Sequence, residues 1–149
     1  EIVGSALVIL RRRIKRHLLK VNVPDDLPLL RCDSVLMERV IINLVENAAK
    51  YSPELSTITL MACLDNNTIL FKVIDQGHGI PELLKERIFE PFYQIKPTTA
   101  GFGLGLTICR SIVEVHGGQI TIDSSADNGT TITIRLPVVE DAPVLSAES

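Results

Sequence analysis

Four polar residues recur at helical spacing within an apolar stretch of the chain: Asn43, Glu46, Asn47 and Lys50. At about 100° per residue, their side chains fall within an arc of about 100° on a helix whose remaining circumference is largely apolar. We call this arc the polar stripe. Leaving such groups buried without partners costs about 1–3 kcal/mol each. The stripe therefore faces either bulk water or a polar ligand, and its two amides, which are mediocre helix formers, favour the ligand.

A carboxylate ends a strand that is otherwise apolar on one face. The strand is predicted over residues 68–75, and Asp75 lies on the same side as three apolar residues, Ile69, Phe71 and Val73. Desolvating a carboxylate without a partner is strongly unfavourable, so Asp75 needs hydrogen-bond donors. The candidates are the amides of Gly77 and Gly79 or an amino group of a ligand. The alternative is that Asp75 only caps the turn that follows.

Three glycines, Gly101, Gly103 and Gly105, precede and open a later helix. The first turn of a helix has unpaired N–H groups and the positive end of the dipole, which favour an anion. Glycine also lets a phosphate approach the backbone closely. No strand directly precedes these glycines and no Gly-Lys-Ser follows, so they form neither a dinucleotide-binding fingerprint nor a P-loop. Alone, they are a weak indication of a phosphate site.

A few predicted elements must position these residues. A helix begins within residues 1–20, and a short strand lies near Val21. The long helix at 35–51 is capped by Asp33 and Ser34 and stopped by Pro53. Strands follow at 56–64 and 68–75, a short helix at 81–88, a helix from the glycine-rich stretch to about residue 116, and strands at 119–124 and 130–136.

The strands alternate apolar and polar side chains, so one face of the sheet is buried and the other is wet. The inward residues are Ile58, Leu60, Ala62 and Leu64 in the first hairpin, and Thr130, Ile132, Ile134 and Leu136 in the last strand. The predicted fold class is therefore α/β, a two-layer sandwich. A mixed, mostly antiparallel sheet is covered on one face by three helices.

Composition bounds the class of protein. The chain has 149 residues, 46% of them hydrophobic and 22% charged, and a formal net charge of -3, as expected for one globular domain. This charge balance argues against nucleic acid as a partner. Three cysteines without a Cys-x-x-Cys pair favour a reducing, cytosolic setting. No stretch reaches the roughly 20 apolar residues of a membrane span. The basic run in residues 11–20 is interpreted as a solvated face, with a membrane-surface or nucleic-acid role as the alternative.

Four segments together resemble, in order, the N, G1, F and G2 boxes of bacterial sensor histidine kinases. They are Asn43-Leu-Val-Glu46-Asn47-Ala-Ala-Lys50-Tyr51, Asp75-Gln-Gly77-His-Gly79-Ile80, Phe89-Glu-Pro-Phe92 and Gly101-Phe-Gly103-Leu104-Gly105-Leu106. The resemblance covers about residues 1–137, and four boxes in order are far more specific than any one. Glu1-Ile-Val-Gly-Ser-Ala and Leu27-Pro-Leu-Leu are also similar to KdpD-type potassium-responsive kinases. The resemblance implies the Bergerat ATP-binding fold, with ATP and Mg²⁺ bound.

At the phosphate end, the resemblance implies a role for each residue of the stripe. Asn47 coordinates the Mg²⁺ that bridges the ATP phosphates, Asn43 lies beside it, and Lys50 neutralises phosphate charge. The second glycine-rich box cradles the phosphates through Gly101, Gly103, Leu104, Gly105 and Leu106.

At the adenine end, the resemblance implies that Asp75 accepts a hydrogen bond from the 6-amino group. Tyr51 lies against the base, and Thr130 supports Asp75 through its hydroxyl or a water. The remaining residues of this pocket are Gly77, Gly79, Ile80 and Phe92.

The resemblance also bears on the reaction. Gyrase, Hsp90 and MutL share the fold and hydrolyse ATP with a glutamate four residues before the metal asparagine, where this chain has Asn43. An amide is no general base, so we predict phosphoryl transfer, which depends mainly on positioning and charge neutralisation. Glu46 is assigned an orienting or metal-water role. The lid at residues 94–100 lacks arginine, and Lys96 is the candidate replacement.

The acceptor in this family is a histidine on a separate dimerisation domain, and none of His17, His78 and His116 resembles it. We therefore expect residues 1–20 to lead from that missing domain, 21–137 to be the catalytic domain and 138–149 a disordered tail. This chain is expected to be cytoplasmic, as the cytoplasmic part of an inner-membrane sensor kinase that serves a response regulator. The alternatives are an anti-sigma-type kinase or hydrolytic relative, and a non-catalytic binding module.

Overall fold

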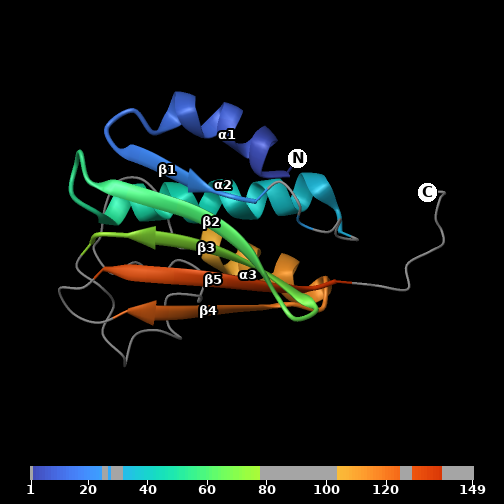
Figure 1. Ribbon diagram of the computed structural model, residues 1–149. Coiled ribbons are helices and arrows are strands. Elements are labelled where there is room, and N and C mark those ends of the chain that lie inside the picture. Colours follow the sequence, from blue (N-terminus) through green and yellow to red (C-terminus); the bar gives the residue numbers. More distant parts are fainter. Residues whose placement is uncertain (1, 25–26, 28–31, 78–103, 125–128, 139–149) are drawn as a thin grey trace.

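The computed structural model describes residues 2–24, 27, 32–77, 104–124 and 129–138 (Figure 1). Within these residues the elements are α1 (Ile2–Arg13), β1 (Leu18–Asn22), α2 (Ser34–Tyr51), β2 (Thr57–Asp65), β3 (Thr68–Asp75), α3 (Leu104–Val115), β4 (Gln119–Ser124) and β5 (Thr130–Pro137). Their bounds lie close to the predicted ones. The short helix predicted at 81–88 lies outside the described residues.

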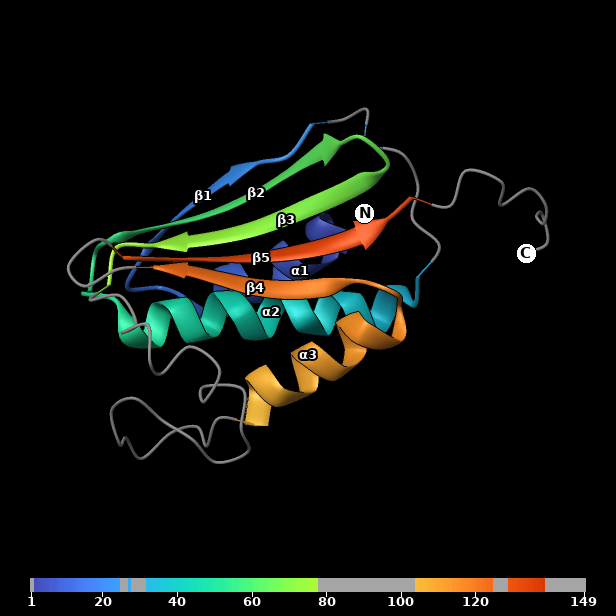
Figure 2. The same ribbon diagram turned by 90° about the horizontal axis from the view of Figure 1, so that it is seen from below.

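The five strands form one mixed sheet in the order β1-β2-β3-β5-β4. β1 pairs with β2 in parallel, and the other three pairs are antiparallel. The three helices lie on one face of the sheet, with α2 between α1 and α3 (Figures 1 and 2). The predicted two-layer sandwich is therefore confirmed. Among the described helices, none is both long and apolar enough to cross a lipid bilayer.

The core lies between the helices and the inner face of the sheet, and α1 is part of it. Val3, Ala6 and Leu10 of α1 are buried in the same cluster as the inward side chains of α2 and of the strands. Their spacing is the helical period, so α1 presents one continuous apolar stripe to the core. α1 is thus packed into the described fold.

One residue of β2 departs from the predicted alternation. Ile58, Leu60 and Ala62 are buried, but Leu64 is 50% exposed, so the prediction that all four side chains are buried is wrong at Leu64. β1 pairs only with residues 57–61 of β2. Leu64 lies beyond this pairing and next to the last residue of β2, close to the turn into β3.

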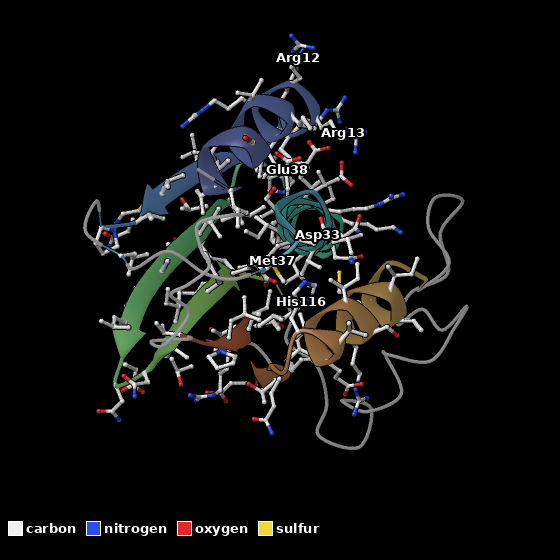
Figure 3. The ribbon with its side chains drawn as sticks, turned by 90° about the vertical axis from the view of Figure 1, so that its right-hand side faces the viewer. Arg12, Arg13, Asp33, Met37, Glu38 and His116 are labelled. Carbon is white, nitrogen blue, oxygen red and sulfur yellow. The ribbon has the colours of Figure 1, made fainter. Side chains whose placement is uncertain are left out.

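The start of α2 is tied to the end of α3. The carboxylate of Asp33 caps α2, as predicted, by accepting a hydrogen bond from the N–H of Leu36 (3.0 Å). The N–H of Asp33 itself donates to Nε2 of His116, just after α3 (3.1 Å; Figure 3). Nδ1 of His116 lies 2.7 Å from the carbonyl oxygen of Ile112. A neutral ring that donates at Nδ1 and accepts at Nε2 satisfies both contacts. α2 and α3 therefore run antiparallel.

α3 ends in a Schellman motif, as the predicted glycine stop requires. Gly117 has φ of +79°, and its N–H donates to the carbonyl oxygen of Glu114 (3.0 Å). The N–H of Gly118 donates to the carbonyl oxygen of Val113 (2.9 Å). A Cβ on Gly118 would lie 2.2 Å from the carbonyl oxygen of Arg135, so this glycine lets the chain pass directly against β5.

Candidate functional site

The polar stripe lies on the side of α2 that faces away from the sheet, flanked by α1 and α3. Its four side chains, Asn43, Glu46, Asn47 and Lys50, are all half-buried. Val45 on the opposite side of α2 is fully buried. Within the stripe, Glu46 contacts α1 and Asn43 contacts α3. The stripe is therefore neither a fully solvated face nor part of the core.

Glu46 is held by an arginine that the sequence analysis did not single out. Nη1 of Arg13, the last residue of α1, lies 2.7 Å from Oε2 of Glu46. The two side chains are 58% and 34% exposed, so solvent screens the pair and its net stabilisation is small. The contact occupies one oxygen of the Glu46 carboxylate and directs it towards α1. The basic run at the end of α1 is thus partly engaged with the stripe.

Asn43 meets α3 at the fully buried thiol of Cys109. The thiol donates its single proton to the carbonyl oxygen of Val40 (3.7 Å). Because that proton is used, the side-chain N–H of Asn43 is the donor in its hydrogen bond with the same sulfur. The side-chain oxygen of Asn43 takes no part in this hydrogen bond. Burial raises the pKa of Cys109 to about 12, against the lowering effect of the Asn43 hydrogen bond, so the thiol stays protonated at neutral pH.

The start of α3 points towards the end of α2. α3 runs antiparallel to α2, and its Cys109 contacts Val40 and Asn43 of α2, so Leu104 lies on the side of this contact that leads towards the end of α2 (Figure 2). The unpaired N–H groups of the first turn of α3 favour an anion. Leu106 is 9% exposed and anchors the turn in the core.

Lys50 supplies a cation in the last turn of α2. Burial lowers the pKa of its ammonium below the usual 10.5, because desolvation disfavours the charged form. The negative end of the helix dipole favours a cation at this position. Lys50 therefore provides positive charge one helical turn from Asn47.

Asp75 ends β3 with its carboxylate partly buried. Its Oδ1 accepts a hydrogen bond from the N–H of Gly77 (2.7 Å), one of the predicted donors. Thr130 of β5 is its cross-strand partner. Desolvation raises the pKa of Asp75, and backbone hydrogen bonds from Gly77 and Thr130 oppose that rise. Asp75 thus caps the turn, as the alternative interpretation held, and also presents an acceptor at the end of the apolar row.

Gly129, directly before β5, is a further contributor to this region. Its φ is +80°, and a Cβ would lie 2.2 Å from the carbonyl oxygen of Asp75. Only glycine permits this approach. An Asn-Gly pair before a strand was the sequence signal, but nothing local indicated contact with Asp75.

Several predicted site residues lie outside the described residues, so their roles stay predictions: Gly79, Ile80, Phe92, Lys96, Gly101 and Gly103. The side chains of Tyr51 and Leu104 are likewise not described, although both belong to helices.

The residues present fit a magnesium ion that is held mainly through phosphates. In the described part of the chain, no group of three or more His, Cys, Asp or Glu residues could hold a metal by itself. Mg²⁺ usually keeps several waters and binds through one or two protein oxygens plus substrate phosphates. Asn43 and Asn47 lie one turn apart on the stripe, and both carry side-chain amide oxygens. This donor set suits such a site.

The fold and these groups together define a nucleotide-binding domain: an anion-favouring helix start, a stripe of amide and ammonium groups, and a carboxylate at a strand end. The chain belongs to the histidine kinase-, DNA gyrase B- and HSP90-like ATPase family, whose profile matches residues 32–140. Its relatives are sensor histidine kinases, and the chain is a catalytic ATPase domain of that type.

Three similar proteins illustrate the relationship. The sensor protein KdpD of Clostridium acetobutylicum is 38% identical over 141 residues, which are 92% of this chain and 16% of that protein. A mycobacterial sensor histidine kinase, MprB, superposes with a TM-score of 0.79 and 32% identity, covering 91% of both chains. Full-length ShkA in complex with AMPPNP gives a TM-score of 0.79 at 25% identity, covering 91% of this chain and 29% of ShkA. The chain therefore spans only a small part of the KdpD relative.

Proposed function

We propose that this domain binds Mg·ATP and transfers the γ-phosphoryl group to a histidine on a separate dimerisation domain of the same full-length protein. From there the group would pass to an aspartate of a response regulator. The observation that carries this proposal is the antiparallel packing of α2 and α3, which places the polar stripe and an anion-favouring helix start on neighbouring helices. One AMPPNP-bound relative supports the nucleotide class.

At the phosphate end, Asn47 would hold Mg²⁺, with the side-chain oxygen of Asn43 beside it. When bound, the ion supplies charge neutralisation and orientation of the phosphates. Lys50 neutralises further phosphate charge. The backbone of the second glycine-rich box contacts the phosphates through Gly101, Gly103, Leu104, Gly105 and Leu106, and Lys96 approaches from the lid.

At the adenine end, the carboxylate of Asp75 accepts the 6-amino hydrogen bond. The N–H donors of Gly77 and Thr130 already occupy part of its acceptor capacity and hold its orientation. Thr130 also supports Asp75 through its hydroxyl or a water. The remaining contacts with the base are assigned to Tyr51, Gly79, Ile80 and Phe92, as the resemblance implies.

Transfer is favoured over hydrolysis because the site has no good base. Asn43 stands where hydrolytic relatives carry glutamate, and an amide does not accept a proton at working pH. Glu46 is paired with Arg13, which leaves it an orienting role. His116 accepts from the N–H of Asp33, and Nε2 of His17 lies 3.4 Å from the carbonyl oxygen of Ser52. Both rings have structural contacts, which supports an acceptor outside this domain on the cytoplasmic side of a membrane sensor.

Titration of ATP with and without Mg²⁺ tests the proposal. The wild type should bind tightly only with Mg²⁺, and Asn47→Ala should lose about tenfold or more of that metal-dependent affinity. Asn22→Ala, on an exposed position of β1, is the control and should bind like the wild type. If ATP affinity depended neither on Mg²⁺ nor on the Asn47→Ala substitution, the remaining interpretation would be a non-catalytic binding module.

A further inference from the structure

Arg13 is the residue through which α1 reaches the polar stripe. Its guanidinium lies 2.7 Å from Glu46, across a sequence separation of 33 residues. Figure 3 shows Arg12 pointing away from the helix layer, whereas Arg13 lies on the α2 side of α1. These two neighbouring arginines thus have different surroundings. Of the two, Arg13 is the one that contacts the stripe, through Glu46.

The position of Glu46 makes its charge important. It lies directly before Asn47 and one helical turn from Asn43 and from Lys50, all on the same side of α2. An uncompensated carboxylate here would repel a triphosphate, and it would compete with the phosphates for the positive charge of Lys50. A guanidinium at 2.7 Å opposes that field, because its charge has the opposite sign.

We propose that Arg13 is a positioning residue of the nucleotide site, which neutralises the Glu46 carboxylate and holds it on the α1 side of the stripe. The inference rests on the proposed function, since it requires a nucleotide phosphate near Asn47. It makes α1 part of the site's electrostatics, so a displacement of α1 changes the charge that faces the phosphates.

A second ion pair provides a matched control. Nη1 of Arg16 lies 2.6 Å from Oε2 of Glu54, with side chains 76% and 64% exposed. This pair also joins the segment after α1 to the segment after α2, but Glu54 lies beyond the end of α2 and away from the stripe. Arg16→Gln therefore removes a similar surface ion pair without changing the charge beside Asn47.

The experiment measures the dissociation constants of ATP, ADP and adenosine, with Mg²⁺, for five proteins: wild type, Arg13→Gln, Glu46→Gln, Arg13→Gln/Glu46→Gln and Arg16→Gln. In Arg13→Gln, the ATP constant should rise about two- to fivefold at low salt, the range of exposed ion pairs. The ADP constant should rise less and the adenosine constant should not change. Added salt should reduce the difference. The double variant should match Glu46→Gln, and Arg16→Gln should match the wild type.

Specific results would overturn the inference. An equal loss for ATP and adenosine in Arg13→Gln would indicate a purely structural role. A loss that persists when Glu46→Gln is added would mean that Arg13 contacts phosphate directly. Unchanged ATP affinity in Arg13→Gln would exclude any role at the site. If the wild type itself fails to bind ATP, the proposed function is wrong, which distinguishes that failure from failure of the inference.

Discussion

Asp75, a proposed binding residue, has a partly buried carboxylate whose desolvation reduces the stability of the fold. Desolvation raises its pKa above the ordinary 3.8, so its ionised form is less favourable in the folded state than in the unfolded chain. The N–H donors of Gly77 and Thr130 reduce this cost but do not remove it. At neutral pH the carboxylate therefore lowers the free energy of unfolding, while under the proposed function it would provide the acceptor for the adenine.

Replacing Asp75 with asparagine separates stability from binding. We expect Asp75→Asn to melt at or above the wild-type temperature at pH 7. Because a raised pKa means that ionisation opposes folding, the wild type should gain stability relative to the variant as the pH falls towards 3.8. Thermal melting between pH 7 and pH 4 measures this difference.

The same variant should bind ATP about tenfold more weakly, since the charged acceptor of the proposed hydrogen bond is replaced by a neutral amide. Inosine triphosphate, which carries an oxo group in place of the 6-amino group, is the control ligand. The wild type should prefer ATP, and the variant should show a smaller preference. An unchanged preference would mean that Asp75 does not read the base.

The pairing of Asn43 with Cys109 is another residue-scale feature that matters for the site. Asn43 uses its N–H on the sulfur, because the thiol proton is engaged with Val40. Because the N–H of the Asn43 amide contacts the buried thiol, its oxygen is the end left for the proposed metal. The stripe was predicted from periodicity, but the orientation of this amide depends on a residue of α3.

At the scale of elements, two glycines with the same backbone conformation differ in what surrounds them. Gly129 and Gly117 have φ of +80° and +79°. A Cβ on Gly129 would meet the carbonyl oxygen of Asp75 at 2.2 Å, whereas on Gly117 its nearest neighbour would be Cγ of Pro137 at 3.8 Å. At both positions a residue with a Cβ would be strained by the positive φ. Of the two, only Gly129 would also bring that Cβ into a clash with the backbone.

Alanine substitution should separate the two effects. Gly117→Ala should cost about 1 kcal/mol of unfolding free energy, the cost of a left-handed alanine. Gly129→Ala should cost clearly more and should also weaken ATP binding, since β5 must move away from Asp75. Urea denaturation and nucleotide titration measure both quantities. Equal costs, with unchanged binding, would contradict the role assigned to Gly129.

At the scale of the whole molecule, α1 shares one core with α2 and the sheet. Leu10 is fully buried in that core, while Val8 on the same helix is 62% exposed. We expect Leu10→Ala to lower the unfolding free energy by about 2–5 kcal/mol and Val8→Ala to change it by less than about 0.5 kcal/mol. If α1 were an independent segment, Leu10→Ala would leave the main urea transition, followed by circular dichroism, unchanged.

The function was predicted from the resemblance to sensor histidine kinases, because the order of the four boxes can be recognised in the sequence without coordinates. The division of the chain at residue 20 stays a prediction, and the Leu10→Ala experiment bears on it. At the other end, the N–H of Val138 donates to the carbonyl oxygen of Asn67 (2.7 Å), so the described sheet region continues through that residue. Residues 139–149 lie outside the described residues.

Local patterns in the sequence determined the elements. The helical period of α2, its Asp33 cap, the alternation along the strands and the glycine stop after α3 all depend on near neighbours. Tertiary structure alone decided which distant groups meet. Arg13 and Glu46 are 33 residues apart, and Cys109 and Val40 are 69 apart. Such contacts depend on how helices pack side by side on the sheet, and periodicity says which face of a helix is polar without saying what lies next to it.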